Sequence, residues 1–135
     1  MASIDTDPRP LSPHLSVWRF TPAMLASITH RGTGVALYGG TLFLAIWLIA
    51  AAAGPEAFAR VQGLYGSPIG LAALFGWTWA VLFHMMNGIN HLFRDTGRNF
   101  DPAGAQRVAV GQYVVATLLA VAVFAIGFSI KGGAA

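Results

Sequence analysis

The sequence contains no cysteine, so it offers no disulfide, no thiolate metal ligand and no cysteine-held iron–sulfur cluster. Charge is also scarce: 10% of the residues are charged, against about 25% in ordinary soluble domains, and 56% are hydrophobic. Three windows lack Asp, Glu, Lys and Arg altogether: 32–55, 61–93 and 108–130. Each exceeds the roughly 20 residues that a membrane-spanning helix needs. We therefore predict an all-α membrane protein with three transmembrane helices.

Proline and glycine punctuate these windows. Thr21-Pro22 is typical of a helix start and Gly54-Pro55 of a stop. The predicted helices cover 22–53, 68–94 and 104–130, between an N-terminal segment, 1–21, and a tail, 131–135; a short helical turn is expected over 13–18. A helix of 22–53 would be about 48 Å long, which exceeds the ~30 Å hydrocarbon core. We therefore expect its first two turns, Met24 to Arg31, to lie among lipid headgroups or against another protein.

The basic residues are unevenly distributed. Six of them lie before the membrane-embedded part of the first helix or between the second and third helices: Arg9, Arg19, Arg31, Arg94, Arg98 and Arg107. The other two, Arg60 and Lys131, lie in the first loop and the tail. The positive-inside rule then places the N-terminus in the cytoplasm and the C-terminus on the opposite, periplasmic side. Topology thus accounts for the net charge of +3. No basic groove with interleaved aromatics is visible, so we expect membrane lipid and no nucleic acid as a partner.

One histidine lies deep in the second window. At 1.5 Å per residue, His84 is about 15 Å below Arg94, and a polar ring at that depth is a functional-site hypothesis. Two interpretations remain open: a neutral imidazole hydrogen-bonded to a neighbouring helix, or an axial ligand of haem iron. Gly88, one turn later, removes a side chain that would block a porphyrin face. Other metals are not favoured, because the helices contain no Glu-x-x-His or His-x-x-x-His spacing.

The other histidines are predicted not to complete the ligation. His91 shares the face of His84 but lies about 10.5 Å along the helix, whereas two axial nitrogens on one iron are about 4 Å apart. We expect His30 and His14 to lie too near the surface to reach the depth of His84. A second axial ligand would then come from another chain. His91 is predicted to be a boundary residue or a propionate partner, paired with Asp95, and both are candidates for a proton path.

Ser27 and Arg31 form a second candidate site, because residues four apart share one helix face. A hydroxyl and a guanidinium at the membrane interface suit a quinone carbonyl, a propionate or a lipid phosphate. The alternative is that Arg31 only anchors the helix by reaching to the headgroups. With His30 beside them, the sequence leaves both interpretations open.

Three motifs occur in one order and spacing: RPLSPHL at 9–15, SITHRGTG at 27–34 and HMMNGINHLFRD at 84–95. Together they resemble the cytochrome b membrane anchor of succinate dehydrogenase, the enzyme also known as respiratory complex II. The resemblance implies a protein of the bacterial inner membrane that is not an enzyme on its own. Its implied partners are a flavoprotein, an iron–sulfur protein and a second small membrane anchor.

The resemblance also implies roles for individual residues. His84 matches one axial ligand of haem b, and the second anchor supplies the other. Ser27 and Arg31 match positions that line a ubiquinone site beside the iron–sulfur protein, and His30 and Arg31 match positions near the haem propionates. Asn90 departs from the family pattern, which usually has arginine there, so the match is weaker for the propionate contacts than for the ligand.

Three rival interpretations differ in function. A quinol-dependent fumarate reductase anchor would belong to a complex that catalyses the reverse reaction, and a haem-free structural anchor would share only the membrane helices. A transporter component is disfavoured, because the sequence has no pair of broken helices. For quinone reduction, donors such as Ser27 and Arg31 would orient a carbonyl and stabilise the charge that develops on it.

Overall fold

The computed structural model describes residues 18–98 and 100–133; the short helical turn predicted over 13–18 and His14 lie almost entirely outside this part of the chain. The described residues form four helices and no strand: α1 (Pro22–Ala53), α2 (Pro55–Tyr65), α3 (Pro68–Asp95) and α4 (Pro102–Gly133). Three of them, α1, α3 and α4, are long and apolar enough to cross a membrane. The predicted all-α membrane protein with three spanning helices is therefore confirmed.

Each of the four helices described begins with proline at its first position, where the missing N–H removes no helical hydrogen bond. The Thr21 hydroxyl accepts from Met24 N at 3.3 Å, and the Ser67 hydroxyl accepts from Gly70 N at 3.1 Å. α1 has the bounds that the sequence predicts, and α3 extends one residue further. α4 begins two residues earlier than predicted, because Pro102 starts the helix itself and the Asp101 carboxylate caps it through Gly104 N.

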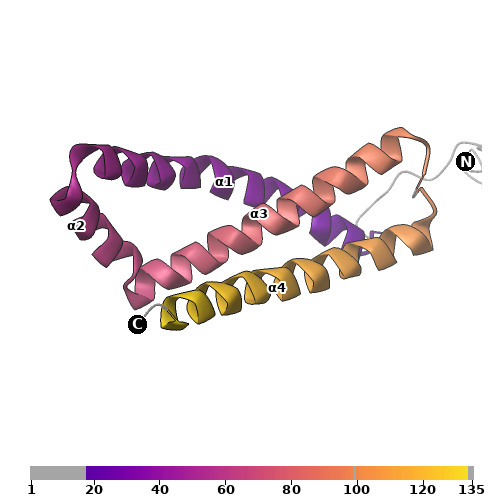
Figure 1. Cartoon of the computed structure of the whole chain (residues 1–135). Helices are drawn as coiled ribbons and strands as arrows, with labels where there is room; N and C mark the ends of the chain where they lie inside the picture. The colour runs from indigo at the N-terminus through magenta and orange to yellow at the C-terminus, as the bar shows by residue number, and fades with distance from the viewer. Residues whose placement is uncertain (1–17, 99, 134–135) are drawn as a thin grey trace, which may run out of the picture.

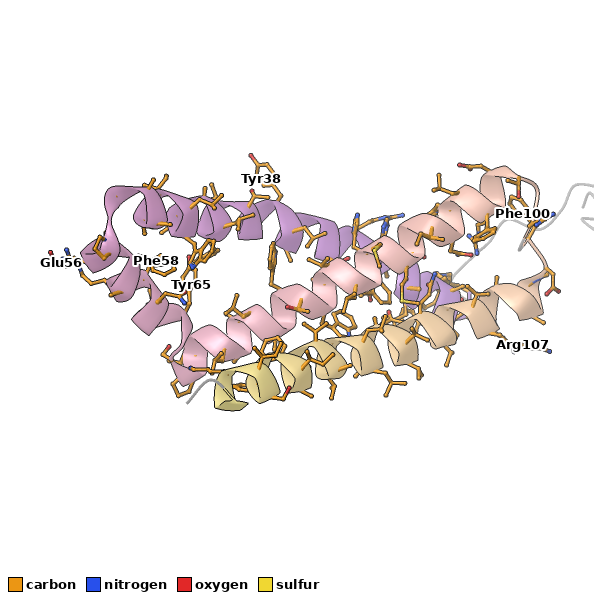
Figure 2. The ribbon with its side chains drawn as sticks, viewed as in Figure 1. Tyr38, Glu56, Phe58, Tyr65, Phe100 and Arg107 are labelled. Atoms are coloured by element: carbon orange, nitrogen blue, oxygen red, sulfur yellow. The ribbon has the colours of Figure 1, made fainter. Side chains whose placement is uncertain are left out.

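Helix α2 was not predicted. Gly54 has φ 116°, a backbone conformation that favours glycine, and it turns the chain between α1 and α2. Glu56 in the first turn suits the positive end of the helix dipole, and it pairs with Arg60 at 3.4 Å. Figure 2 shows Glu56 pointing away from the bundle at the end where α1 turns into α2.

The long helices cross rather than run parallel. Figure 1 shows α1 crossing α3 and separating from it toward the end closed by α2, while α4 runs beside α3. The buried core lies where α1, α3 and α4 meet, and small side chains surround one large ring: Ala26, Phe83, Ala109 and Ala116. Small residues let membrane helices approach closely, so van der Waals packing can hold them together.

Hydrogen bonds between helices reinforce this packing. The Thr29 and Tyr113 hydroxyls are 2.6 Å apart, joining α1 to α4, and the Trp79 indole N–H donates to the Thr117 hydroxyl at 3.0 Å, joining α3 to α4. The outer surface is apolar: Tyr38, which points outward from α1 in Figure 2, is 79% exposed. Such a surface suits lipid or the helices of another membrane protein.

Candidate functional site

The crossing of α1 and α3 places His30 directly against His84. The two rings are stacked, with centroids 4.0 Å apart and planes inclined by 16°. The prediction that His30 cannot reach the depth of His84 is therefore wrong. α1 enters the bundle at the end where α3 leaves it, so a residue about two turns into α1 lies level with one about three turns before the end of α3.

The hydrogen bonds of His84 fix its protonation pattern. Its Nδ1 lies 3.2 Å from the His30 carbonyl oxygen and 3.3 Å from the Thr33 hydroxyl oxygen, and that hydroxyl donates to the same carbonyl at 2.9 Å. A carbonyl oxygen only accepts, so Nδ1 carries the proton and donates it. In a neutral imidazole, Nε2 is then a bare lone pair, the form that binds metals.

The two interpretations of His84 are therefore compatible. One nitrogen is hydrogen-bonded to the neighbouring helix, and among residues 18–98 and 100–133 no hydrogen bond involves the other. One turn after His84, a Cβ added at Gly88 would meet no atom within 4 Å, so this part of the α3 surface is open. The donor chemistry and the free space fit a haem held through His84 Nε2.

A second axial ligand does not follow from the stacked pair. Two imidazoles that share one iron lie on opposite sides of it, with their lone pairs directed at each other. The parallel rings of His30 and His84 instead present their faces to each other. The Nε2 of His30 is buried and lacks a hydrogen-bond partner. Within the described residues, no group of three or more His, Cys, Asp or Glu residues gathers as a metal cluster.

Ser27 and Arg31 lie one turn apart on α1, and both are exposed. Ser27 also lines a cavity of about 60 Å³ between α1, α3 and α4, whereas Arg31 is not part of its lining. Arg31 makes no ion pair with any described residue. The structure thus leaves the Arg31 guanidinium available at the surface and connects Ser27 to the interior of the bundle.

This cavity, which the sequence did not reveal, is lined by buried amides from two helices. The exposed fractions of Asn87, Asn90 and Gln112 are 5%, 8% and 4%, and Gln112 Nε2 donates to the Met86 carbonyl at 3.4 Å. Arg94 also lines it, and its Nε atom is buried without a partner. The available signal was an amide inside an apolar window, since such side chains tend to hydrogen-bond across membrane helices. A polar cavity of this size has room for a few ordered waters.

His91 and Asp95 do not pair as predicted. Both are exposed, and in the described part of the chain they form no ion pair. The centroid of the His91 ring instead lies 5.5 Å from the centroid of the His30 ring, and His91 lines the polar cavity. His91 thus joins the stacked histidines to the cavity, and Asp95 ends α3 just outside it.

The chain is similar to known membrane subunits over most of its length. The family described as succinate dehydrogenase/fumarate reductase transmembrane subunit matches residues 5–125. The succinate dehydrogenase cytochrome b556 subunit of Paracoccus denitrificans is 38% identical over 92% of this chain and 98% of its own length. The corresponding protein of Rickettsia felis is 38% identical over 68% of this chain and 71% of its own. The mitochondrial cytochrome b560 subunit of Sus scrofa is 36% identical over 67% of this chain and 54% of its own.

Proposed function

This chain belongs to the succinate dehydrogenase/fumarate reductase transmembrane subunit family, and we propose that it anchors a bacterial succinate:quinone oxidoreductase as its cytochrome b subunit. Such a protein is not an enzyme on its own. Its proposed partners are the flavoprotein, the iron–sulfur protein and a second small anchor. The arginine distribution supports an orientation in which the N-terminus and the α3–α4 loop face the cytoplasm, and the bacterial relatives support a bacterial inner-membrane protein.

The hydrogen bonding of His84 carries the proposal. Its Nδ1–H is donated to α1, so its Nε2 lone pair is the natural axial ligand for haem b. A haem b bound there would supply one-electron redox chemistry beside the quinone site. The second axial ligand is assigned to the partner anchor, because His30 is stacked on His84 and His91 lies on the same helix. The buried, unpartnered Nε2 of His30 and the exposed guanidinium of Arg31 suit the haem propionates.

We place the ubiquinone site at Ser27 and Arg31. Their donors lie on one turn of α1 at the cytoplasmic end, where the iron–sulfur protein would dock. There they would orient a quinone carbonyl and stabilise the negative charge that grows on it during reduction. Reduction of a quinone to a quinol takes up two electrons and two protons.

The protons are proposed to come from the cytoplasm through His91, Asp95 and the polar cavity. Ser27 and His91 line the same cavity, and its buried amides can hold bridging water. Asp95→Asn should slow quinone reduction by less than the roughly 10²-fold that a general acid contributes, because exposed water can partly replace it. A solvent isotope effect on quinone reduction that is larger in Asp95→Asn than in the wild type would support this path, and an unchanged isotope effect would contradict it.

The haem assignment is tested with the assembled complex. His84→Ala should abolish the native low-spin b-type spectrum, whereas the control His91→Ala, on the same helix, should retain it. A native low-spin spectrum in His84→Ala would overturn the assignment. This chain expressed without the second anchor should likewise lack the bis-histidine spectrum. A wild-type complex without any b-type absorption would favour the haem-free anchor instead.

A quinol-dependent fumarate reductase anchor is the second candidate, because the family includes both kinds of protein. The relatives described above are all succinate dehydrogenase subunits, which favours succinate oxidation. Comparing the rates of succinate oxidation and fumarate reduction by the purified complex would separate the two.

A further inference from the structure

We infer that Thr33, together with the main-chain carbonyl of His30, positions His84 as a ligand, and that Gly34 keeps the space this position requires. The inference rests on the proposed function, in which His84 binds haem iron. It concerns Thr33 and Gly34 of α1, which have no role in the proposed quinone site or proton path. The His30 carbonyl and the Thr33 hydroxyl contact the His84 side chain of α3, and a Cβ added at Gly34 would contact it too.

The Thr33 hydroxyl is held in place before it meets the histidine. It donates to the His30 carbonyl at 2.9 Å, so its proton is already used and its lone pairs remain. The Thr33 hydroxyl oxygen lies 3.3 Å from His84 Nδ1, and the His30 carbonyl oxygen lies 3.2 Å from the same nitrogen. The Nδ1–H is therefore shared between two acceptors on one turn of helix, and Thr33 is only 7% exposed.

Among the residues that the structure describes, two acceptors and no donor lie around Nδ1, and this arrangement selects a single tautomer. The opposite tautomer would place a lone pair on Nδ1 against a carbonyl oxygen, which repels it. Hydrogen bonds to the second ring nitrogen of a ligating histidine also fix the ring orientation and raise its basicity as a ligand. A more basic ligand stabilises ferric iron over ferrous iron, which lowers the midpoint potential of a haem held there.

Gly34 supplies the space. A Cβ at this position would lie 3.2 Å from His84 Cε1 and 3.7 Å from Nδ1. Because Cε1 lies between the two ring nitrogens, a methyl group there would press on the edge of the ring that carries both the hydrogen bond and the ligand atom. Gly32, on the same helix, is a matched control, since a Cβ there meets no atom within 4 Å.

The test uses the whole complex and measures haem properties rather than turnover. Thr33→Val keeps the shape of the side chain but removes one acceptor. We expect the affinity for haem to fall by about tenfold, at the lower end of the range for such supporting partners. If that loss falls on the ferric form, the midpoint potential rises by about 59 mV for the one-electron couple. Thr33→Ser should restore the wild-type potential, because it restores the hydroxyl.

Gly34→Ala provides a second, independent perturbation. It should shift the electron paramagnetic resonance signal of the ferric low-spin haem, because the ring must move, while Gly32→Ala should leave the signal unchanged. A wild-type potential in Thr33→Val together with a wild-type resonance signal in Gly34→Ala would overturn the inference. If His84→Ala nevertheless loses the haem, the proposed function survives that result. Retention of the native low-spin haem in His84→Ala would instead remove the proposed function itself.

Discussion

Replacing Arg31 with alanine should separate quinone handling from simple anchoring. Arg31 is exposed and makes no ion pair among the described residues, so the substitution leaves no protein partner uncompensated. A hydrogen bond to a charged group contributes about 1.5–3 kcal/mol. At about 1.36 kcal/mol per factor of ten, quinone reduction should slow by roughly 10- to 150-fold. Ser27→Ala removes a neutral donor of about 0.5–1.5 kcal/mol, so a loss of roughly two- to tenfold is expected.

The assay compares two electron acceptors in the same preparation of the complex. Succinate oxidation by ubiquinone should fall in both variants, while oxidation by an artificial acceptor at the flavin end should remain near wild type. Arg107→Ala is a suitable control, because Arg107 is an exposed cation on α4 that points away from the bundle (Figure 2). Arg107→Ala should leave both activities unchanged.

Three results would refute this reasoning in different ways. If both activities fell together in Arg31→Ala, the residue would hold the complex together rather than bind quinone. If Arg107→Ala matched Arg31→Ala, general attraction to lipid headgroups would explain the effect. Normal quinone kinetics in both Ser27→Ala and Arg31→Ala would place the quinone elsewhere.

Two further substitutions test the packing that supports the site. Gly40→Ala should destabilise the complex by about 1–3 kcal/mol, because the added Cβ would overlap the Trp77 indole. The control Gly39→Ala has open space for its Cβ and should leave the stability unchanged. Equal thermal stabilities of the two variants would contradict the close packing of α1 on α3. Tyr113→Phe removes one member of the 2.6 Å hydroxyl pair with Thr29 and should lower stability by about 0.6 kcal/mol in a denaturant titration, a typical value for hydrogen bonds between membrane helices. A loss of several kcal/mol would show that this hydroxyl holds more than one helix contact.

The sequence alone was sufficient to predict the spanning helices and to single out His84 as a candidate functional residue. The spanning helices could be predicted from the scarcity of charge, because a charged side chain is costly in hydrocarbon and long uncharged windows are rare in soluble proteins. Pro22 and Pro68 located the starts of the first two spanning helices, since the missing N–H of proline is harmless only in the first turn, and Pro102 lies two residues before the predicted start of the third. His84 was identifiable for the same reason, as a polar ring in an apolar run. The helix α2 was missed because its residues carry no long apolar pattern and its start depends on the turn at Gly54.

The tertiary structure decided how the helices meet, which no single helix encodes. Depth counted along α1 placed His30 near the surface, but the crossing of α1 over α3 brings its ring onto that of His84. The same crossing supplies the acceptors that fix the tautomer of His84, and they lie on a different helix from the ligand. The polar cavity likewise combines side chains from α1, α3 and α4. Each of these features joins residues far apart in sequence, so periodicity along one helix cannot predict it.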